Sequence, residues 1–152
     1  MVSKEFNVKA LKIIPIFSNL SEEILEEMRT ALRVTKLDSG EIVVREGDSA
    51  DRLFVLVSGE VQVIKNYLEP GSQMVDVLQP GAFFGEMALV GEGEARSATV
   101  LTSEPSHFVT LDREAFKRVL LENPDVCFAL LEEAYRRLRQ ANDIITTLQG
   151  DS

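Results

Sequence analysis

The segment from Phe84 to Val100 reads F-G-E-M-A-L-V-G-E-G-E-A-R-S-A-T-V. Its first glycine, Gly85, permits a tight turn in which the backbone can approach a ligand closely, because no Cβ intervenes. Arg96 is the only positively charged residue of the segment, and a guanidinium matches two phosphate oxygens where a lysine acts as a point charge. The carboxylate of Glu86 is suited to accept hydrogen bonds from a sugar hydroxyl. The segment therefore predicts a site for a small ligand that carries both an anionic group and a sugar.

The residues after Gly85 add backbone donors to this site. Glu86 to Leu89 is expected to form a single helical turn, whose first N–H groups have no intrahelical partner and carry a partial positive charge. An oxyanion binds favourably at such a position. Ser97 adds a hydroxyl donor next to Arg96. The alternative is an ordinary surface hairpin with an Arg–Glu ion pair.

On these residues the chain resembles the phosphate-binding cassette of the cyclic-nucleotide-binding domain family. It is most similar to the bacterial catabolite activator branch, which has the same ten-residue step from the glutamate to an Arg-Ser-Ala, and the resemblance extends from about Ile16 to Leu148. It implies that Arg96 and Ser97 bind the cyclic phosphate and that Glu86 binds the ribose 2′-hydroxyl. The ligand-binding residues expected in this segment are Phe84, Gly85, Glu86, Met87, Ala88, Arg96, Ser97 and Ala98.

The resemblance also implies a place for the base, between the β-roll and the last helix. Val63 and Val75 would line its apolar side, and Ala141 and Asn142 would face it. The activator branch has two hydroxyl residues at the last two positions, so a syn or an anti base stays open. Cyclic-GMP binders often carry threonine beside the arginine, where this chain has Ser97; cAMP is the expected ligand and cGMP the alternative.

Length and composition favour one soluble domain, 1–152, in the cytoplasm. The 152 residues are 45% hydrophobic, and no apolar run approaches the roughly 18 residues that span a bilayer, so no membrane association is expected. The N-terminal residues lack the pattern of a signal peptide. The single cysteine, Cys127, excludes an internal disulfide and is predicted to pack in the core. A net charge of −9 argues against nucleic acid as a partner and makes an anion site depend on Arg96.

Patterning divides the chain into three parts. N-terminal helices are expected within 1–33, one from Ser3 to Ile14 and one that begins at the N-cap Ser21 and ends near Arg33. From 34 to 111, short β-branched runs alternate with turns, which predicts a roll of about eight strands. Ser58-Gly59 between two such runs predicts a two-residue hairpin. The runs are Leu53–Val57, Val61–Ile64, Val75–Leu78, Ala98–Leu101 and Phe108–Leu111.

Two helices are expected within 112–148. Asp112 is the predicted N-cap of the first helix. Asn123 as N-cap, with Pro124 at the first helical position, predicts the start of a long second helix. The apolar stripe of the second helix steps by three and four residues, which fits a heptad seam with a second copy of the chain as well as packing on its own domain. The stripe comprises Leu131, Ala134, Leu138, Ala141, Ile145 and Leu148. The whole chain thus predicts a mainly β fold with flanking helices, and by resemblance an eight-stranded β-roll of the jelly-roll (double-stranded β-helix) kind.

The sequence does not favour an enzyme. His107 is the only histidine and is expected to be structural, whereas metal-dependent rolls of the cupin type use histidine clusters, so no metal or cofactor is expected. A DNA-binding regulator would need a helix-turn-helix segment, and none occurs before Ser152. A cyclic nucleotide sensor that signals through helix 124–148 to an effector protein is the leading hypothesis. A structural or partner-binding roll that has lost its ligand is the alternative, and a stand-alone protein and a segment of a larger one both stay open.

Overall fold

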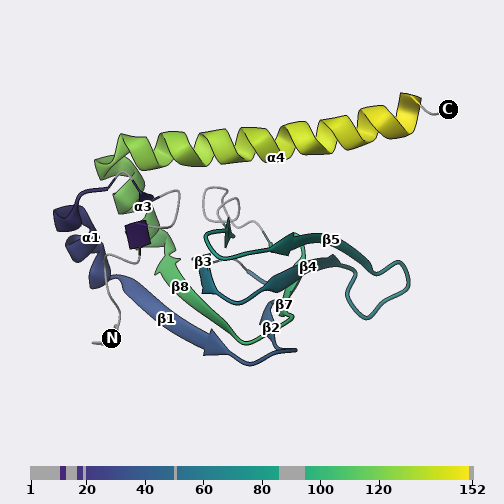
Figure 1. Ribbon diagram of the computed structural model, residues 1–152, viewed down its shortest axis with the longest axis horizontal. Helices are drawn as coiled ribbons and strands as arrows, with labels where there is room; N and C mark the ends of the chain where they lie inside the picture. Colours follow the sequence, from purple (N-terminus) through teal and green to yellow (C-terminus); the bar gives the residue numbers. More distant parts are fainter. Residues whose placement is uncertain (1–10, 13–16, 19, 50, 86–94, 151–152) are drawn as a thin grey trace.

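The computed structural model describes residues 11–12, 17–18, 20–49, 51–85 and 95–150, except for the side chains of residues 137, 141, 144, 145 and 150 (Figure 1). The elements follow one another as α1 (Glu22–Arg29), β1 (Leu32–Leu37), β2 (Ile42–Val44), β3 (Arg52–Ser58), β4 (Val61–Lys65), β5 (Gln73–Leu78), β6 (Phe83–Phe84), β7 (Thr99–Thr102), β8 (Ser106–Asp112), α3 (Arg113–Glu122) and α4 (Pro124–Gly150). In this part of the chain, no helix is both long and apolar enough to span a bilayer.

The strands form two four-stranded antiparallel sheets, in the orders β1-β8-β3-β6 and β2-β7-β4-β5. In Figure 1, α1 and α3 lie together at one end of the sheets, and α4 runs along one side of the molecule from α3 to the end of the chain. The predicted mainly β fold, an eight-stranded roll with flanking helices, is confirmed. The predicted helix over Ser3–Ile14 lies almost wholly outside the described residues.

Strand β3 is apolar almost throughout because both of its faces are buried. Successive side chains of a strand point to opposite faces. Leu53 and Val55 accordingly pack in a core cluster with residues of α1 and α3. Phe54 and Leu56 pack in a second cluster, which takes residues from both sheets and therefore fills the space between them: Val61, Phe84, Val100 and Phe108.

The second predicted helix begins where expected but is shorter. Ser21 caps α1, with the N–H of Ile24 donating to its hydroxyl over 3.2 Å. The helix ends at Arg29 rather than near Arg33, because the chain turns and Leu32 enters β1 opposite Leu111 of β8. The apolar residue Leu32, which fits the helical stripe, is in fact a fully buried strand residue.

The hairpin predicted at Ser58-Gly59 is wrong, because β3 and β4 belong to different sheets. Gly59 instead serves a close approach. It has a φ of +98°, and a Cβ there would overlap the carbonyl of Pro105 and the backbone of Ser106 at the start of β8. The glycine thus lets the chain cross from one sheet to the other against the beginning of β8.

The C-terminal helices begin as predicted. The carboxylate of Asp112 caps α3 by accepting from the N–H of Ala115 over 2.8 Å, and Pro124 is the first residue of α4. The side chain of Asn123 departs from its expected role as a cap for α4. Its amide donates to the carbonyl of Val119 over 3.0 Å, so the side chain closes the preceding helix.

Candidate functional site

The segment that carries the predicted site is described at its two ends. Phe84 ends β6 and Gly85 follows it, and Ala95 to Ala98 lead into β7. The three candidates Glu86, Met87 and Ala88 lie outside the described residues, as does the helical turn expected there. The geometry of the site is therefore given by the glycine, the arginine and the residues around them.

Gly85 and Arg96 lie directly against each other. A Cβ at Gly85 would overlap Nη1 of Arg96 and would come within 2.8 Å of the carbonyl oxygen of Arg52. The φ of Gly85 is +92°, in the region that favours glycine. The group that Gly85 meets in the structure is the guanidinium expected to bind the phosphate, whereas the expected approach of its backbone to a ligand stays a prediction.

Arg96 is an arginine in a buried position, with 7% of its surface exposed. Its Nη2 donates to the carbonyl of Arg52 over 2.9 Å, and its Cζ lies 5.7 Å from the centroid of the Phe54 ring. The backbone is fixed as well, because the N–H of Arg96 donates to Asp48 over 2.8 Å and its carbonyl accepts from Gly47 over 2.9 Å. Charged side chains are rarely buried to this extent unless other groups pair or hydrogen-bond with them. The contacts of Arg96 therefore determine where its guanidinium lies.

Phe54, which lies next to the guanidinium, belongs to a cluster of three phenylalanines. Phe54 and Phe84 are cross-strand partners whose rings stack with centroids 5.0 Å apart and planes 2° from parallel. Phe108 meets both rings edge-on, at 6.0 Å from Phe54 and 6.2 Å from Phe84. All three belong to the cluster between the sheets, so the site is built on the core.

The structure brings together Phe84, Gly85 and Arg96, which the sequence singled out, with Phe54 and the carbonyl of Arg52, which it did not. No local motif marks these two positions, since Phe54 reads as an ordinary strand residue. Of the residues after Arg96, Ser97 is exposed, whereas Ala98 is buried. A hydroxyl at position 97 is accordingly accessible to a ligand.

The residues expected to hold the base are spread over three elements. Val63 on β4 is half-buried, and Val75 on the neighbouring edge strand β5 is exposed. Asn142 is exposed on α4, and the side chain of Ala141 lies outside the described residues. The structure places Val63 and Val75 on adjacent strands of one sheet. It does not bring Val75 and Asn142 into a common buried site in the described part of the chain.

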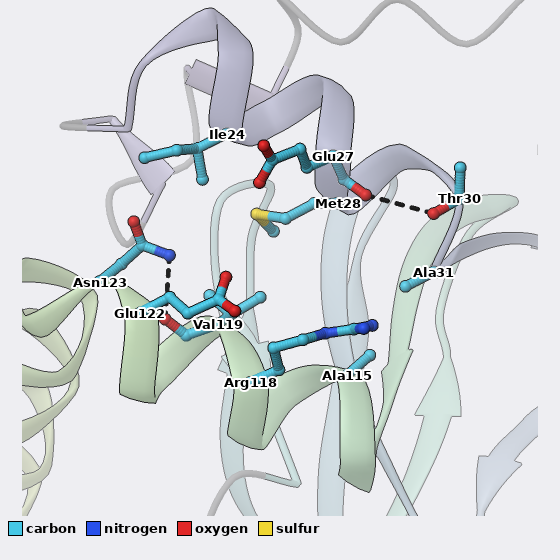
Figure 2. Close-up of a pocket in the computed structure, with 10 residues that line it drawn as sticks. All are labelled: Ile24, Glu27, Met28, Thr30, Ala31, Ala115, Arg118, Val119, Glu122 and Asn123. Carbon is cyan, nitrogen blue, oxygen red and sulfur yellow. Dashed lines mark hydrogen bonds between the residues drawn. The ribbon is translucent and has the colours of Figure 1, made fainter.

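Two of the pockets in the described part are lined by residues other than Arg96. One, of about 550 Å³, lies between residues 76–83 and α4, where Glu132, Arg136 and Gln140 line it. The other, of about 280 Å³, lies between α1 and α3 (Figure 2). Apolar side chains such as Met28 and Val119 form part of its wall. The larger pocket thus separates part of α4 from the end of β5 and the residues that follow it.

Cys127 and His107 both lie at the surface of the protein. Cys127 is exposed, so its predicted place in the core is wrong. Only its neighbour Val126 is buried in that turn of α4, because the helix meets the rest of the molecule on one side. His107 is an exposed residue of β8 opposite Lys36 and Ser58.

Comparisons with known proteins identify one family and several relatives. The profile of the family described as cyclic nucleotide-binding domain matches residues 34–123. The chain is 38% identical over 111 residues to a cGMP-dependent protein kinase of Caenorhabditis elegans, which is 70% of this chain and 14% of the kinase. It is 36% identical over 107 residues to a cAMP-dependent protein kinase regulatory subunit of Yarrowia lipolytica, which is 70% of this chain and 27% of the subunit. The chain therefore spans only a small part of these relatives.

A solved structure shows the same arrangement of elements. The catabolite activator protein of Thermus thermophilus is similar with a TM-score of 0.78 and 27% identity, over 89% of this chain and 63% of that one.

Proposed function

Because the chain belongs to the family of cyclic nucleotide-binding domains, we propose that it binds a cyclic purine mononucleotide at Arg96 and acts as a non-catalytic sensor. The resemblance inferred from residues 84–100 is confirmed by the family match. The observation that carries the proposal is the buried guanidinium of Arg96, held against Gly85 at the end of β6. A planar cation fixed beside a turn without a side chain is suited to a phosphate that approaches the backbone closely.

Each candidate residue has a role in this proposal. Arg96 and the exposed hydroxyl of Ser97 bind the cyclic phosphate, with backbone donors from Gly85 to Ala88. Glu86 accepts from the ribose 2′-hydroxyl. The base lies along the strands at Val63 and Val75, and Ala141 and Asn142 of α4 close over it.

The proposed ligand is cAMP. The relatives include a cGMP-dependent protein kinase and a regulatory subunit of a cAMP-dependent protein kinase. The chain has Ser97 beside the arginine rather than threonine, which supports cAMP. A competition assay in which cGMP displaces a fluorescent cAMP analogue at lower concentration than cAMP does would reverse this assignment.

The binding proposal is tested by Arg96→Ala. Removing the buried charge partner of a phosphate is expected to reduce the affinity by roughly 2 to 4 kcal/mol in titration calorimetry with cAMP and with cGMP. Arg33→Ala is the matched control, because it removes the same charge from an exposed position on β1, at the opposite edge of the sheet from β6. Equal affinity of the wild type and Arg96→Ala contradicts the proposal, and a roll without nucleotide binding then remains.

We further propose that α4 carries the signal, through pairing with a second copy of the chain. Four large apolar side chains on α4 are between 60 and 64% exposed and are spaced by three, four and three residues: Phe128, Leu131, Tyr135 and Leu138. Ala134 of the predicted stripe is half-buried, so the exposed seam runs through Phe128 and Tyr135. Asn142 lies four residues after Leu138 and so on the same face of the helix. A contact of Asn142 with the base is therefore coupled to the seam.

Hydrogen exchange tests whether α4 responds to ligand. A ligand shifts an equilibrium only through contacts that differ between the two states, and closure of Asn142 over the base supplies such a contact. Protection of residues 138–148 and the mass of the particle in solution are expected to change at saturating cAMP. If both stay the same while calorimetry shows binding, the chain is a passive binding module.

A further inference from the structure

The two halves of α4 differ in how they meet the rest of the molecule. In the first half, Val126, Ala129 and Leu130 pack against the core. From Tyr135 to Gln149, every side chain that the structure describes is exposed. An isolated helix of about 15 residues is only marginally stable in water, because helices in proteins are stabilised mainly by the packing of an apolar face. The second half of α4 is therefore expected to be covered by another surface.

The seam of α4 offers enough apolar surface to pair with a second copy of the chain. Phe128, Leu131, Tyr135 and Leu138 are 60 to 64% exposed, and Leu148 beside the seam is 70% exposed. A large side chain exposed to this extent still has about 100 Å² to bury. Over two copies, these residues supply about 1,000 Å², the size that a specific interface between proteins needs.

The seam lies on the other side of α4 from the roll to which the helix belongs. Val126, which is buried in the core, lies two residues before Phe128, or about 200° around the helix. The half-buried Glu133 lies in the same relation to Tyr135. Two copies can therefore join their seams while each roll stays on the outside of the pair.

Asn142 places a side-chain amide within this seam. It lies four residues after Leu138, which makes it an a position of the heptad, where a and d are the two positions that face the partner helix. The d positions are Leu131, Leu138 and Ile145. An amide between two helices loses its hydrogen bonds to water, so it needs a partner across the pair.

The partner of Asn142 depends on the direction of the two helices. In a parallel pair in register, each a residue lies beside the same residue of the other copy, and two Asn142 amides can donate to and accept from each other. In an antiparallel pair, an a residue lies opposite d residues, and all three d residues of this seam are apolar. Only the parallel pair in register therefore satisfies both amides and covers the whole seam.

We propose that Asn142 sets the direction and register of the α4 pair, so that two copies of the chain join as a parallel dimer with both rolls at the same end. The inference rests on the proposed pairing through α4. A single asparagine at an a position specifies the register and the oligomeric state of a coiled coil at a cost in stability. Since an amide has two donors, an Asn142 that bonds its counterpart retains a donor for the base.

Disulfide formation tests the direction. In a Cys127→Ser background, which has no other cysteine, Leu131→Cys and Gln149→Cys each place one thiol on the seam, about 27 Å apart along the helix. Each variant is expected to form a disulfide-linked dimer with itself on mild oxidation, as measured by electrophoresis without reductant. Gln140→Cys, about 200° around the helix from Leu138, is the matched control and is expected to stay unlinked.

An antiparallel pair can bring only one of the two positions next to itself. Links at only one position, links that form mainly between Leu131→Cys and Gln149→Cys chains when these are mixed, or no links at all in a protein that sediments as a dimer overturn the inference. A wild-type chain that sediments as a monomer removes the pairing, and the proposed direction with it. Calorimetry with cAMP then reports separately on the proposed nucleotide binding.

The role of Asn142 itself is tested by Asn142→Leu. This substitution is expected to lower the dissociation constant of the dimer about tenfold in analytical ultracentrifugation, because two leucines pack more favourably in a seam than two amides do. It is also expected to permit links between Leu131→Cys and Gln149→Cys chains, which the amides exclude in their parents. If Asn142→Leu leaves the pattern of links unchanged, Asn142 does not set the direction and the inference fails.

Discussion

Gly85 is the residue at which the geometry of the site is most restrictive. Its backbone has a φ of +92°, and the space that a side chain would occupy holds the guanidinium of Arg96 and the carbonyl of Arg52. A flexible arginine can move away from a new methyl group, but a backbone carbonyl in β3 cannot do so without shifting the sheet. Both the positive φ and the lack of space for a Cβ therefore require a glycine at position 85.

Gly85→Ala is expected to reduce both stability and ligand affinity. The positive φ alone destabilises alanine by about 1 kcal/mol. The overlap with Arg96 and Arg52 adds to this loss and displaces the guanidinium. Urea unfolding measures the first effect, and calorimetry with cAMP measures the second.

Gly40→Ala is the control for this substitution. Gly40 has a φ of +81°, but nothing lies within 4 Å of a Cβ built there. It is expected to show the loss from backbone strain and no change in affinity. Equal effects of the two substitutions on both measurements would show that Gly85 is needed for its backbone conformation alone.

The sequence singled out Gly85 and Arg96, which lie together in the structure, but not the residues that surround them. Gly85 and Arg96 are close in the chain, and their residue types carry recognisable properties. Phe54 and the carbonyl of Arg52 reach the site because β3 pairs with β6, and the contact of Arg96 with Arg52 joins positions 44 residues apart. The periodicity of a strand that is buried on both faces does not tell which face meets a guanidinium.

Among the elements, α3 begins directly from β8 and depends on one cap. Asp112 ends the strand and accepts from the N–H of Ala115 at the start of the helix. Asp112→Ala is expected to lower the free energy of unfolding by about 1 kcal/mol, whereas Asp112→Asn, which retains a capping oxygen, is expected to lose less. Urea unfolding of both variants measures the difference. Identical losses would show that the cap contributes nothing.

The exposed seam of α4 predicts the effect of charge on assembly. Leu131→Glu with Leu138→Glu places carboxylates on the seam and is expected to shift a dimer to monomers in analytical ultracentrifugation. Gln140→Glu adds a carboxylate about 200° around the helix from Leu138, and it is expected to leave the mass unchanged. A wild-type chain that sediments as a monomer at all concentrations tested would contradict the pairing.

Local patterns predicted the beginnings of elements more reliably than their ends and connections. Ser21, Asp112 and Pro124 begin their helices as expected, because capping depends on a few neighbouring residues. The end of α1 and the path after Gly59 depend on pairing with β8, which is distant in sequence. Leu32 fits both a helical stripe and a strand, and only its partner Leu111 decides between them.

For the molecule as a whole, the charge of the protein and that of its proposed ligand have the same sign. The net charge is −9, and a cyclic nucleotide carries a negative phosphate. Repulsion of this kind acts at long range and is screened by salt, with a Debye length of about 30 Å at 0.01 M and about 10 Å at 0.1 M. The association rate constant for a fluorescent cAMP analogue is therefore expected to rise between these two ionic strengths in stopped-flow measurements.

A charge variant separates this effect from local attraction. Glu69→Lys with Glu104→Lys, at two exposed turn positions, changes the net charge from −9 to −5, since each substitution adds two positive charges. The salt dependence of the association rate is expected to be weaker in this variant. A rate that falls with salt in the wild type would show that the field near Arg96 outweighs the charge of the whole molecule.

The position of β8 in the middle of its sheet has a consequence for how the protein folds during synthesis. β8 pairs with β1 on one side and with β3 on the other, although it is the last strand of the roll to leave the ribosome. Pairings between residues so far apart in sequence close large loops and are slow to form. A nascent chain that ends before Ser106 already contains Arg96 and Phe54 but lacks Phe108, and its β1 and β3 have no neighbour between them. Closure of the roll and completion of the cluster of Phe54, Phe84 and Phe108 therefore belong to the same late step of folding.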